Sequence, residues 1–219
     1  MSSLSPPSPG ADAPASDGPT VFIVDDEAEV SKSLRWLIES VGLRVETFST
    51  ASEFLERYRS RDPGCLVLYV RMPTMSGLEL QERLNAQAVA LPIIFVTGHG
   101  GVQTAVRALK GGAIDFIEKP FDDQRMLDLV QKAIAVDAEN RRRAAAHAEA
   151  SARHASLSVR ERAVLDLLIE GRTNKEIARA LGLSAKTVEN YRANVMEKMA
   201  VSTVPHLVKV VLELRGSAR

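Results

Sequence analysis

The hydrophobic positions between Thr20 and Val136 follow two alternating spacings. Short runs of β-branched and other apolar residues, typical of buried strands, alternate with stretches in which apolar residues recur every three or four positions, as on one face of a helix. The runs predict strands at 21–24, 44–48, 65–70, 93–97 and 113–117. The amphipathic stretches predict helices at 28–41, 51–60, 77–86, 102–110 and from 122 onward.

Repeated strand–helix units joined by short connections favour one fold class. They predict an α/β domain in which a five-stranded, doubly wound parallel sheet is covered by helices on both faces. Such sheets place their functional groups at the carboxyl ends of the strands. Polar residues at the ends of the predicted strands are therefore the first candidates for chemistry.

The pattern becomes purely helical after the sheet domain. Residues 137–155 are dominated by Ala, Glu and Arg and carry little apolar surface, which predicts a helical linker. Four amphipathic stretches follow, and their starts are marked by Ser158 with Glu161, Thr173 with Glu176, Ser184, and Thr203. Apolar residues on both sides of Gly182 have the spacing of two helices that close on a small core. This predicts an all-α, four-helix domain that contains a helix-turn-helix.

The boundaries of these patterns divide the chain into four segments. We predict a disordered tail at 1–19, a sheet domain at 20–136, the linker at 137–155 and the helical domain at 156–219. The tail has neither a basic start nor an apolar stretch, so it does not resemble a signal peptide. No run of about 18 apolar residues occurs in the sequence, which argues against a membrane span.

Charge and cysteine content are weaker indicators of the chain's partners and compartment. The chain has 28 Lys and Arg and 28 Asp and Glu, but acidic residues prevail through Val136 and basic residues prevail from Ser156 onward. A basic module fits a nucleic-acid partner, although so small a surplus is equally consistent with an ordinary solvated surface. The single cysteine, Cys65, excludes a disulfide within the chain and makes a reducing cytoplasm the natural compartment.

Polar residues stand at the ends of four predicted strands. Asp25 and Asp26 follow the first strand, and two adjacent carboxylates repel each other unless they share a cation. They suggest a Mg²⁺ site, with a plain helix N-cap pair as the alternative. The other strand ends carry 69–73, Thr97 and 116–120. Because these ends meet at one edge of the sheet, their convergence favours a functional site.

Together these residues resemble the receiver domain of two-component response regulators, in particular the FixJ-like group, over nearly all of 21–135. The resemblance implies a flavodoxin-like order of strands. It also implies that Asp25, Asp26 and the backbone carbonyl of Arg71 hold Mg²⁺.

The same resemblance assigns roles in phosphoryl binding. It implies that Lys119 neutralises phosphoryl oxygens and that the Thr97 hydroxyl contacts the phosphoryl group once it is bound. It implies that Phe116 is the aromatic switch. It further implies a cis peptide bond between Lys119 and Pro120, a geometry that is rare outside bonds preceding proline.

One position departs from the family pattern. Receiver domains carry an aspartate as phosphoryl acceptor at the end of the third strand, and this chain has Tyr69 there. The acceptor must be an ionised carboxylate that attacks phosphorus and also binds the metal, whereas a phenol with an ordinary pKa of about 10 is neutral at pH 7. We therefore expect no phosphorylation and weakened Mg²⁺ binding. In this interpretation Tyr69 is a β-favouring residue whose ring fills the pocket.

Two accounts of Tyr69 stay open at this stage. The other pocket residues are intact, which favours a recent or engineered replacement that silences a phosphorylation-driven regulator. Alternatively, the chain is a pseudo-receiver gated by a ligand or a partner protein, in which the tyrosine engages Lys119 or an aspartate. A third hypothesis, a phosphatase-like hydrolase that uses the two aspartates and Mg²⁺, lacks a nucleophile, so we do not expect an enzyme.

The helical domain resembles the LuxR/NarL-type helix-turn-helix through 157–161, 171–178 and 183–191. The resemblance implies a transcription regulator that binds double-stranded DNA with its second helix in the major groove. Amides and guanidinium groups pair with base edges, and Lys and Thr more often hold phosphates. We expect base contacts from Asn190 and Arg192, phosphate contacts from Lys175, Lys186 and Thr187, and either kind from Asn194. Glu189 either accepts from cytosine or repels phosphate.

The two resemblances also imply partners. A cognate sensor histidine kinase is expected for the receiver, and no membrane partner is expected. The fourth helix, fifth strand and fifth helix of an activated receiver imply a homodimer that places two helix-turn-helix units on adjacent half-sites. The apolar stripe from Leu207 to Leu214 resembles a dimerisation helix, although the same stripe also suits the core of the domain. Without the motif, a protein-binding helical bundle would be the alternative.

Overall fold

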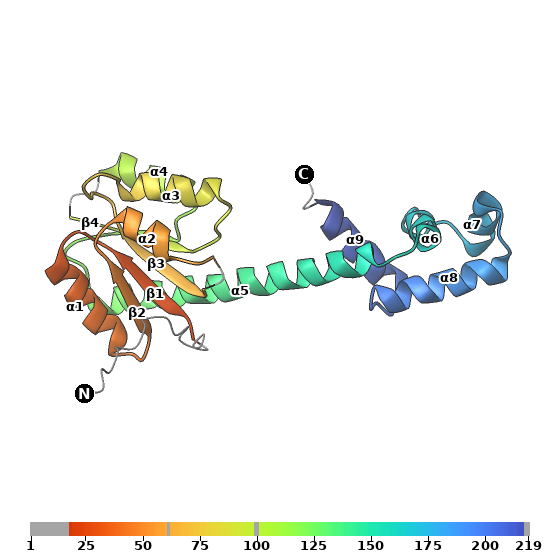
Figure 1. Cartoon of the computed structure of the whole chain (residues 1–219), viewed down its shortest axis with the longest axis horizontal. Helices are drawn as coiled ribbons and strands as arrows, with labels where there is room; N and C mark the ends of the chain where they lie inside the picture. Colours follow the sequence, from red (N-terminus) through yellow and green to blue (C-terminus); the bar gives the residue numbers. More distant parts are fainter. Residues whose placement is uncertain (1–17, 61, 99–100, 217–219) are drawn as a thin grey trace, which may run out of the picture. The chain divides into compact units, whose positions relative to one another are not determined.

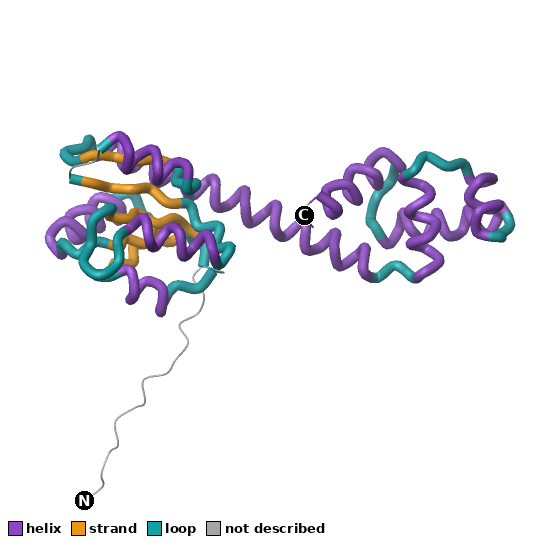
Figure 2. The backbone as a smooth tube through the Cα atoms, turned by 90° about the horizontal axis from the view of Figure 1, so that it is seen from above, coloured by secondary structure: helices purple, strands orange, loops and turns teal. Residues whose placement is uncertain are grey.

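The computed structural model describes residues 18–60, 62–98 and 101–216. Most of the predicted tail, 1–17, lies outside the described residues. The chain forms two compact units that divide between Asn140 and Arg141. As the colours of Figure 2 show, the first unit contains both strands and helices and the second contains helices and loops.

A five-stranded sheet forms the centre of the first unit (Figure 1). Its strands are β1 (Thr20–Val24), β2 (Arg44–Phe48), β3 (Gly64–Tyr69), β4 (Ile93–Thr97) and β5 (Asp115–Glu118). All pairs are parallel, and the strands lie in the order β2-β1-β3-β4-β5. This order confirms the predicted doubly wound, flavodoxin-like sheet. β1, β3 and β4 are buried along their whole length, which explains their continuous apolar runs.

Helices cover both faces of the sheet. They are α1 (Ala28–Glu39), α2 (Ala51–Arg57), α3 (Gly77–Ala86), α4 (Val102–Lys110) and the first part of α5 (Asp123–Ala155). Apolar residues of α1 and α5 pack with Val21 and Ile23 on one face. Those of α2, α3 and α4 pack with Phe22 and Val24 on the other face. Since consecutive residues of β1 point to opposite faces, this strand contributes to both cores.

Several elements differ at their ends from the prediction, and the differences are largest at α2 and β5. α2 ends at Arg57 rather than at 60, because Tyr58 takes an extended conformation with ψ of 138°. β5 begins at Asp115 rather than at 113, since the backbone N–H of Ala113 donates to the carbonyl of Ala108 at the end of α4 (3.1 Å). β5 also ends at Glu118 rather than at 117, and β3 ends at Tyr69 rather than at 70, so the predicted polar residues stay at or directly after the strand ends.

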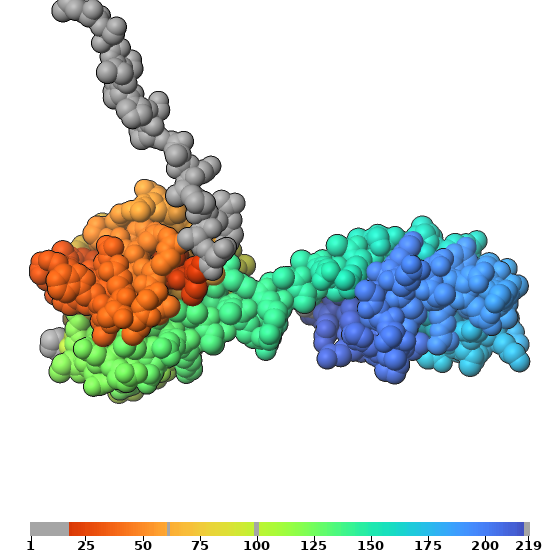
Figure 3. All heavy atoms as spheres, turned by 90° about the horizontal axis from the view of Figure 1, so that it is seen from below, coloured from red at the N-terminus to blue at the C-terminus, as the bar shows by residue number. Residues whose placement is uncertain are grey.

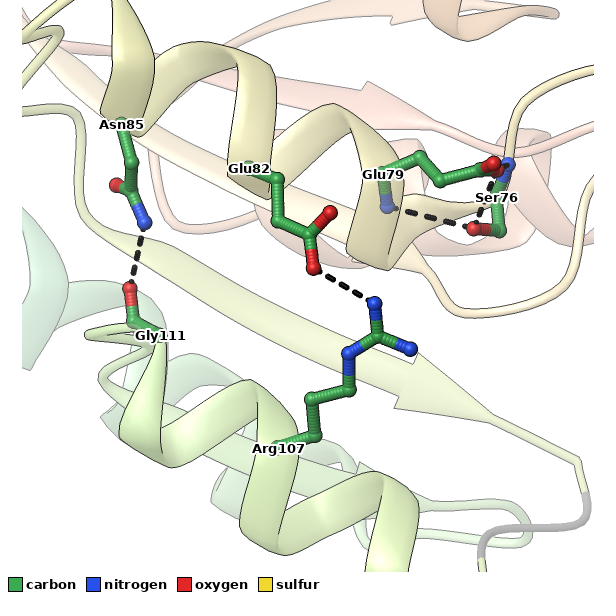
Figure 4. A network of polar contacts seen from close by, with 6 residues as sticks. All are labelled: Ser76, Glu79, Glu82, Asn85, Arg107 and Gly111. Carbon is green, nitrogen blue, oxygen red and sulfur yellow. Dashed lines mark hydrogen bonds and ion pairs between the residues drawn. The ribbon is translucent and has the colours of Figure 1, made fainter.

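Polar contacts join α3 to α4 (Figure 4). Arg107 Nη2 lies 2.6 Å from Glu82 Oε1, and Asn85 Nδ2 donates to the carbonyl of Gly111 at 2.9 Å. The Arg107 and Glu82 side chains are both well exposed. The contacts therefore bridge the surface of the two helices rather than their apolar interface.

α5 continues without a break from Asp123 to Ala155 and crosses the division between the units. Its buried residues extend from Met126 to Asp137, and no residue of the helix after Asp137 is buried. Asp137 Oδ2 accepts a hydrogen bond from the backbone N–H of Gly64 at the start of β3 (2.9 Å). Beyond this contact the helix is mostly exposed, as its Ala, Glu and Arg content leads one to expect.

The second unit packs four further helices around one apolar core. They are α6 (Val159–Ile169), α7 (Asn174–Leu181), α8 (Ala185–Lys198) and α9 (Val204–Gly216), drawn from cyan to blue in Figure 3. Ser158 and Thr173 begin α6 and α7 with the predicted capping boxes. Gly182 closes α7 in the left-handed conformation (φ 65°), which glycine adopts without steric cost. The predicted all-α domain is confirmed.

Candidate functional site

The carboxyl ends of β1, β3, β4 and β5 meet at one edge of the sheet. Asp25 follows β1, Tyr69 ends β3, Thr97 ends β4 and Lys119 follows β5. The parallel register aligns these ends, because Val24 pairs with Leu68 and the next residue of β3, Tyr69, pairs with Val96. The predicted pocket residues are thus brought together by topology, although they are far apart in the sequence.

Asp25, directly after β1, is buried at this edge of the sheet and is only 2% exposed. Its Oδ1 accepts a hydrogen bond from the backbone N–H of Glu27 (3.0 Å). Its Oδ2 is buried and has no hydrogen-bond partner among the described residues. Burial raises the pKa of Asp25 from 3.8 to about 6, against the opposing effects of the Glu27 N–H and the positive charge of Lys119. Asp26, the next residue, is exposed.

Tyr69 ends β3, the strand next to β1, and its side chain is 5% exposed. The ammonium group of Lys119 lies over its ring, 4.2 Å from the ring centroid, in a cation–π contact. The hydroxyl is buried and lacks a hydrogen-bond partner in the described part of the chain. Burial, with the negative charges of Asp25 and Glu27, raises the pKa of the phenol well above its ordinary value. A neutral phenol in this position is neither a nucleophile nor an anionic metal ligand.

The carboxylates at this edge are oxygen donors of the kind that bind Mg²⁺. Mg²⁺ is commonly bound through one or two carboxylates together with waters and phosphate oxygens. Asp25 has an unpartnered carboxylate oxygen and Asp26 is exposed beside it, so two such carboxylates are present. Arg71, whose carbonyl was predicted as a ligand, lies in the loop after β3. Among the described residues no group of three or more Asp, Glu, His or Cys is placed to hold a metal.

The remaining predicted pocket residues lie on the neighbouring strand ends. Thr97 is buried, and its carbonyl accepts a hydrogen bond from the backbone N–H of Lys119 (2.8 Å). The ring of Phe116 is partly buried and lies 6.5 Å from that of Phe95, centroid to centroid. The peptide bond between Lys119 and Pro120 is cis, as predicted.

In the second unit, α7 and α8 form the helix-turn-helix. Ile177 of α7 and Val188 and Val195 of α8 are buried in the core. Ser184 begins α8, since its Oγ accepts a hydrogen bond from the backbone N–H of Thr187 (3.0 Å). The two hydroxyls of Ser184 and Thr187 are also hydrogen-bonded to each other (2.8 Å). These contacts fix the first turn of α8.

The predicted DNA-binding residues fall into two groups. Four are exposed on the surface of the unit, namely Lys175, Lys186, Asn190 and Asn194. Thr187 and Arg192 are partly buried. Thr187 bonds to Ser184 as described, and Arg192 Nη1 donates to Asn174 Oδ1 at the start of α7 (3.2 Å).

Sequence reasoning missed two contacts of this surface. Asn174 was not singled out, although it begins α7 and bonds Arg192 eighteen residues later. Glu189 was left with two alternative roles toward DNA, and its pairing with the ammonium group of Lys186 (3.2 Å) was not predicted. The spacing i, i+3 on one helix was the available signal for the second contact. No local pattern signals the first.

Comparison with known proteins identifies both units. Residues 21–131 match the response regulator receiver domain, and residues 155–211 match the luxR family of bacterial regulatory proteins. The chain is 47% identical over 192 residues to the transcriptional regulatory protein FixJ of Azorhizobium caulinodans, across 88% of this chain and 91% of that protein. The chain belongs to the FixJ/NarL family of response regulators.

Further relatives of this response regulator span both units. It is 42% identical over 199 residues to the response regulator protein TmoT of Ectopseudomonas mendocina, across 91% of this chain and 90% of that protein. Among solved structures it is similar to the response regulator StyR, with a TM-score of 0.80 and 45% identity over 90% of this chain and 99% of that chain. The similarity therefore covers the receiver, α5 and the helical unit together.

As a response regulator of the FixJ/NarL family, the chain is a DNA-binding transcription regulator of a two-component system. Receiver domains in general bind Mg²⁺ at the acceptor site, and regulators with a LuxR-type domain bind DNA and interact with sensor kinases. In the part of the chain that the structure describes, no helix combines the length and apolar character needed to cross a membrane.

Proposed function

We propose that this transcription regulator carries a receiver that phosphotransfer does not switch, because Tyr69 stands at the acceptor position. The observation that supports this most directly is the buried, neutral phenol beneath the ammonium group of Lys119. Phosphotransfer from a kinase requires an ionised oxygen nucleophile at this point, and burial disfavours ionisation of the phenol. The regulator is then a silenced variant of a phosphorylation-driven family.

The other pocket residues keep the roles that the family assigns to them. Lys119 would neutralise phosphoryl oxygens, the Thr97 hydroxyl would contact a bound phosphoryl group, and Phe116 would be the aromatic switch. Here the ammonium group of Lys119 faces the Tyr69 ring instead, at 4.2 Å from its centroid. This contact also supports the alternative in which the tyrosine replaces phosphate as the partner of Lys119 and the receiver is gated by a ligand or a partner protein.

Mg²⁺ binding is part of the same proposal. Asp25, Asp26 and the carbonyl of Arg71 would hold the ion, which when bound supplies positive charge at the pocket. A third carboxylate is missing, so we propose that the affinity is lower than in a receiver with an acceptor aspartate. The unpartnered Oδ2 of Asp25 supports the site, since a cation would compensate that buried charge.

We propose that residues 156–219 bind DNA, that 137–155 act as the linker and that 20–136 form the receiver. In the DNA complex, Lys175, Lys186 and Thr187 would contact phosphates, Asn190 and Arg192 would contact base edges, and Asn194 would contact either a base edge or a phosphate. Active molecules would form homodimers, which place two recognition helices on adjacent half-sites. A cognate sensor histidine kinase would contact the receiver without passing a phosphoryl group to it.

The deciding experiment compares the chain with Tyr69→Asp and Tyr69→Asn. Each protein is incubated with Mg²⁺ and radiolabelled acetyl phosphate, and incorporated label is counted. We expect label only in Tyr69→Asp, because this variant alone supplies the carboxylate. Tyr69→Asn is the matched control, since it removes the ring without adding a nucleophile.

Sedimentation and DNA binding, with and without Mg²⁺ and beryllofluoride, complete the test. Dimerisation and a gain in DNA affinity by Tyr69→Asp alone, only with the mimic, would support the silenced regulator. Label on the unaltered chain would contradict it. Dimerisation and DNA binding by the untreated chain would favour the phosphate-independent alternative.

A further inference from the structure

The burial pattern of α8 defines one continuous exposed face. Its members recur at helical spacing and are Lys186, Glu189, Asn190, Ala193, Asn194 and Glu197. The opposite face holds Val188 and Val195 in the core. A helix placed in the major groove presents its exposed face to the bases, and its first turns reach them most readily. On this placement, Glu189 and Asn190 are the residues of α8 best positioned to contact base edges.

The carboxylate of Glu189 is held in place on this face. Lys186 Nζ lies 3.2 Å from Glu189 Oε2, and both side chains are exposed. The pairing leaves Oε1 free of Lys186 and compensates the negative charge of the side chain. An acidic residue on a DNA-binding helix would otherwise be repelled by phosphates. The ion pair partly compensates the charge of Glu189 and so reduces its repulsion by phosphates.

A second contact fixes how α8 is turned about its axis. Arg192 Nη1 donates to Asn174 Oδ1 at 3.2 Å, and both residues are partly buried. The bond ties the middle of α8 to the start of α7. One turn beyond Glu189, Ala193 offers only a methyl group. On its C-terminal side, Glu189 can thus approach a base edge without obstruction by the residue one turn along the face.

We propose that Glu189 determines specificity by accepting a hydrogen bond from the amino group of a cytosine in the operator. This inference rests on the proposed insertion of α8 into the major groove. A carboxylate only accepts hydrogen bonds, and the amino donors in that groove belong to cytosine and adenine. Adenine presents the acceptor N7 beside its amino group, which repels a carboxylate, whereas cytosine has no acceptor on that side. Cytosine is therefore selected.

The experiment is selection from a randomised pool of DNA duplexes. It uses the full chain, Glu189→Gln and the matched control Glu197→Gln, an exposed glutamate about two turns further along the same face. All three selections are repeated in Tyr69→Asp with Mg²⁺ and beryllofluoride. Circular dichroism verifies that each variant is folded.

We expect Glu189→Gln to lower the enrichment of cytosine about tenfold at one position of each half-site and to raise adenine there, because an amide both accepts from and donates to adenine. Glu197→Gln should select the same sequence as the parent. If Glu189→Gln selected the same DNA sequence as the parent chain, the inference would be overturned and the proposed function would be unaffected. No enriched sequence for any protein, with or without the mimic, would overturn both.

Discussion

Asp25 in the receiver and Glu161 in the DNA-binding unit are both buried acids, yet their surroundings differ. Glu161 is 4% exposed, and its Oε2 accepts hydrogen bonds from the backbone N–H of Ser158 (2.7 Å) and from Lys198 Nζ (2.8 Å). The hydrogen bond from Lys198 has the largest effect and that from the Ser158 N–H the next largest, and together they lower the pKa of Glu161 from 4.5 to about 2. Asp25 has one partnered and one unpartnered oxygen, and its pKa is raised to about 6.

The difference separates a structural acid from a functional one. Glu161 accepts both of these hydrogen bonds, one of them from a cation, within its own unit, so its charge stabilises the fold. Asp25 is left incomplete, so its charge is costly until a cation from outside compensates it. Tyr69 adds to this imbalance, because a phenol there supplies no negative charge to attract the cation and brings an unpartnered hydroxyl of its own.

The largest effect on stability is expected when Glu161 loses its partner Lys198. Lys198→Met leaves the Glu161 carboxylate buried without its cation and should lower the melting temperature of the DNA-binding unit by several degrees. Lys209→Met is the control, because Lys209 and Glu213 are both exposed and lie 3.9 Å apart. Calorimetry of the full chain measures both. Equal effects of the two variants would mean that Glu161 is no better integrated than a surface acid.

The two acids should also respond to pH with opposite signs. The pKa of Glu161 is lowered from 4.5 to about 2, so its contribution to stability is present above pH 4.5 and is lost as the pH falls toward 2. The pKa of Asp25 is raised from 3.8 to about 6, so its contribution is present below pH 3.8 and is lost as the pH rises through 6 in buffer without Mg²⁺.

Hydrogen exchange of amides in β3 and α8, measured against pH, reports on the two units separately. Asp25→Asn should flatten the response of the receiver between pH 4 and 6, and Glu161→Gln should flatten that of the DNA-binding unit below pH 4.5. Added Mg²⁺ should reduce the Asp25 effect in the parent chain. A receiver that becomes more stable as the pH rises from 4 to 6 because of Asp25 would contradict the comparison.

These acids also mark what the sequence reveals and what it does not. The alternation of strands with helices and the capping box of Ser158 with Glu161 depend on local spacing, and each was predicted and found, whereas the strand order was implied by the family resemblance. The pairing of Glu161 with Lys198 joins residues 37 positions apart and depends on how α6 packs against α8. Likewise, the position of Lys119 over the Tyr69 ring was one of several arrangements that the sequence allowed. Long-range side-chain contacts follow from packing, which no local pattern encodes.

A smaller effect on stability is expected when the unpartnered hydroxyl of Tyr69 is removed from the receiver pocket. Tyr69→Phe keeps the ring beneath Lys119 and removes the buried, unpartnered hydroxyl, so it should stabilise the receiver by about 1 to 2 kcal/mol. Urea titration monitored by hydrogen exchange measures the change. Tyr191→Phe, on a partly exposed tyrosine of the other unit, is the control and should change stability little. A loss of stability in Tyr69→Phe would show that the hydroxyl has a partner in solution.

The smallest effect is expected from an ion pair that is short but exposed. Arg107 and Glu82 approach to 2.6 Å between α3 and α4, with side chains 60% and 59% exposed (Figure 4). Arg107→Met should therefore cost less than about 1 kcal/mol, because water already solvates both charges. Gln81→Met in the same helix pair removes the buried hydrogen bond from Gln81 Nε2 to the Ala108 carbonyl and should cost more, about 0.5 to 1.5 kcal/mol, although this carbonyl keeps the Ala113 N–H as a donor. If Arg107→Met were the more costly change, distance rather than burial would decide which polar contacts matter here, and the contrast between Asp25 and Glu161 would lose its physical basis.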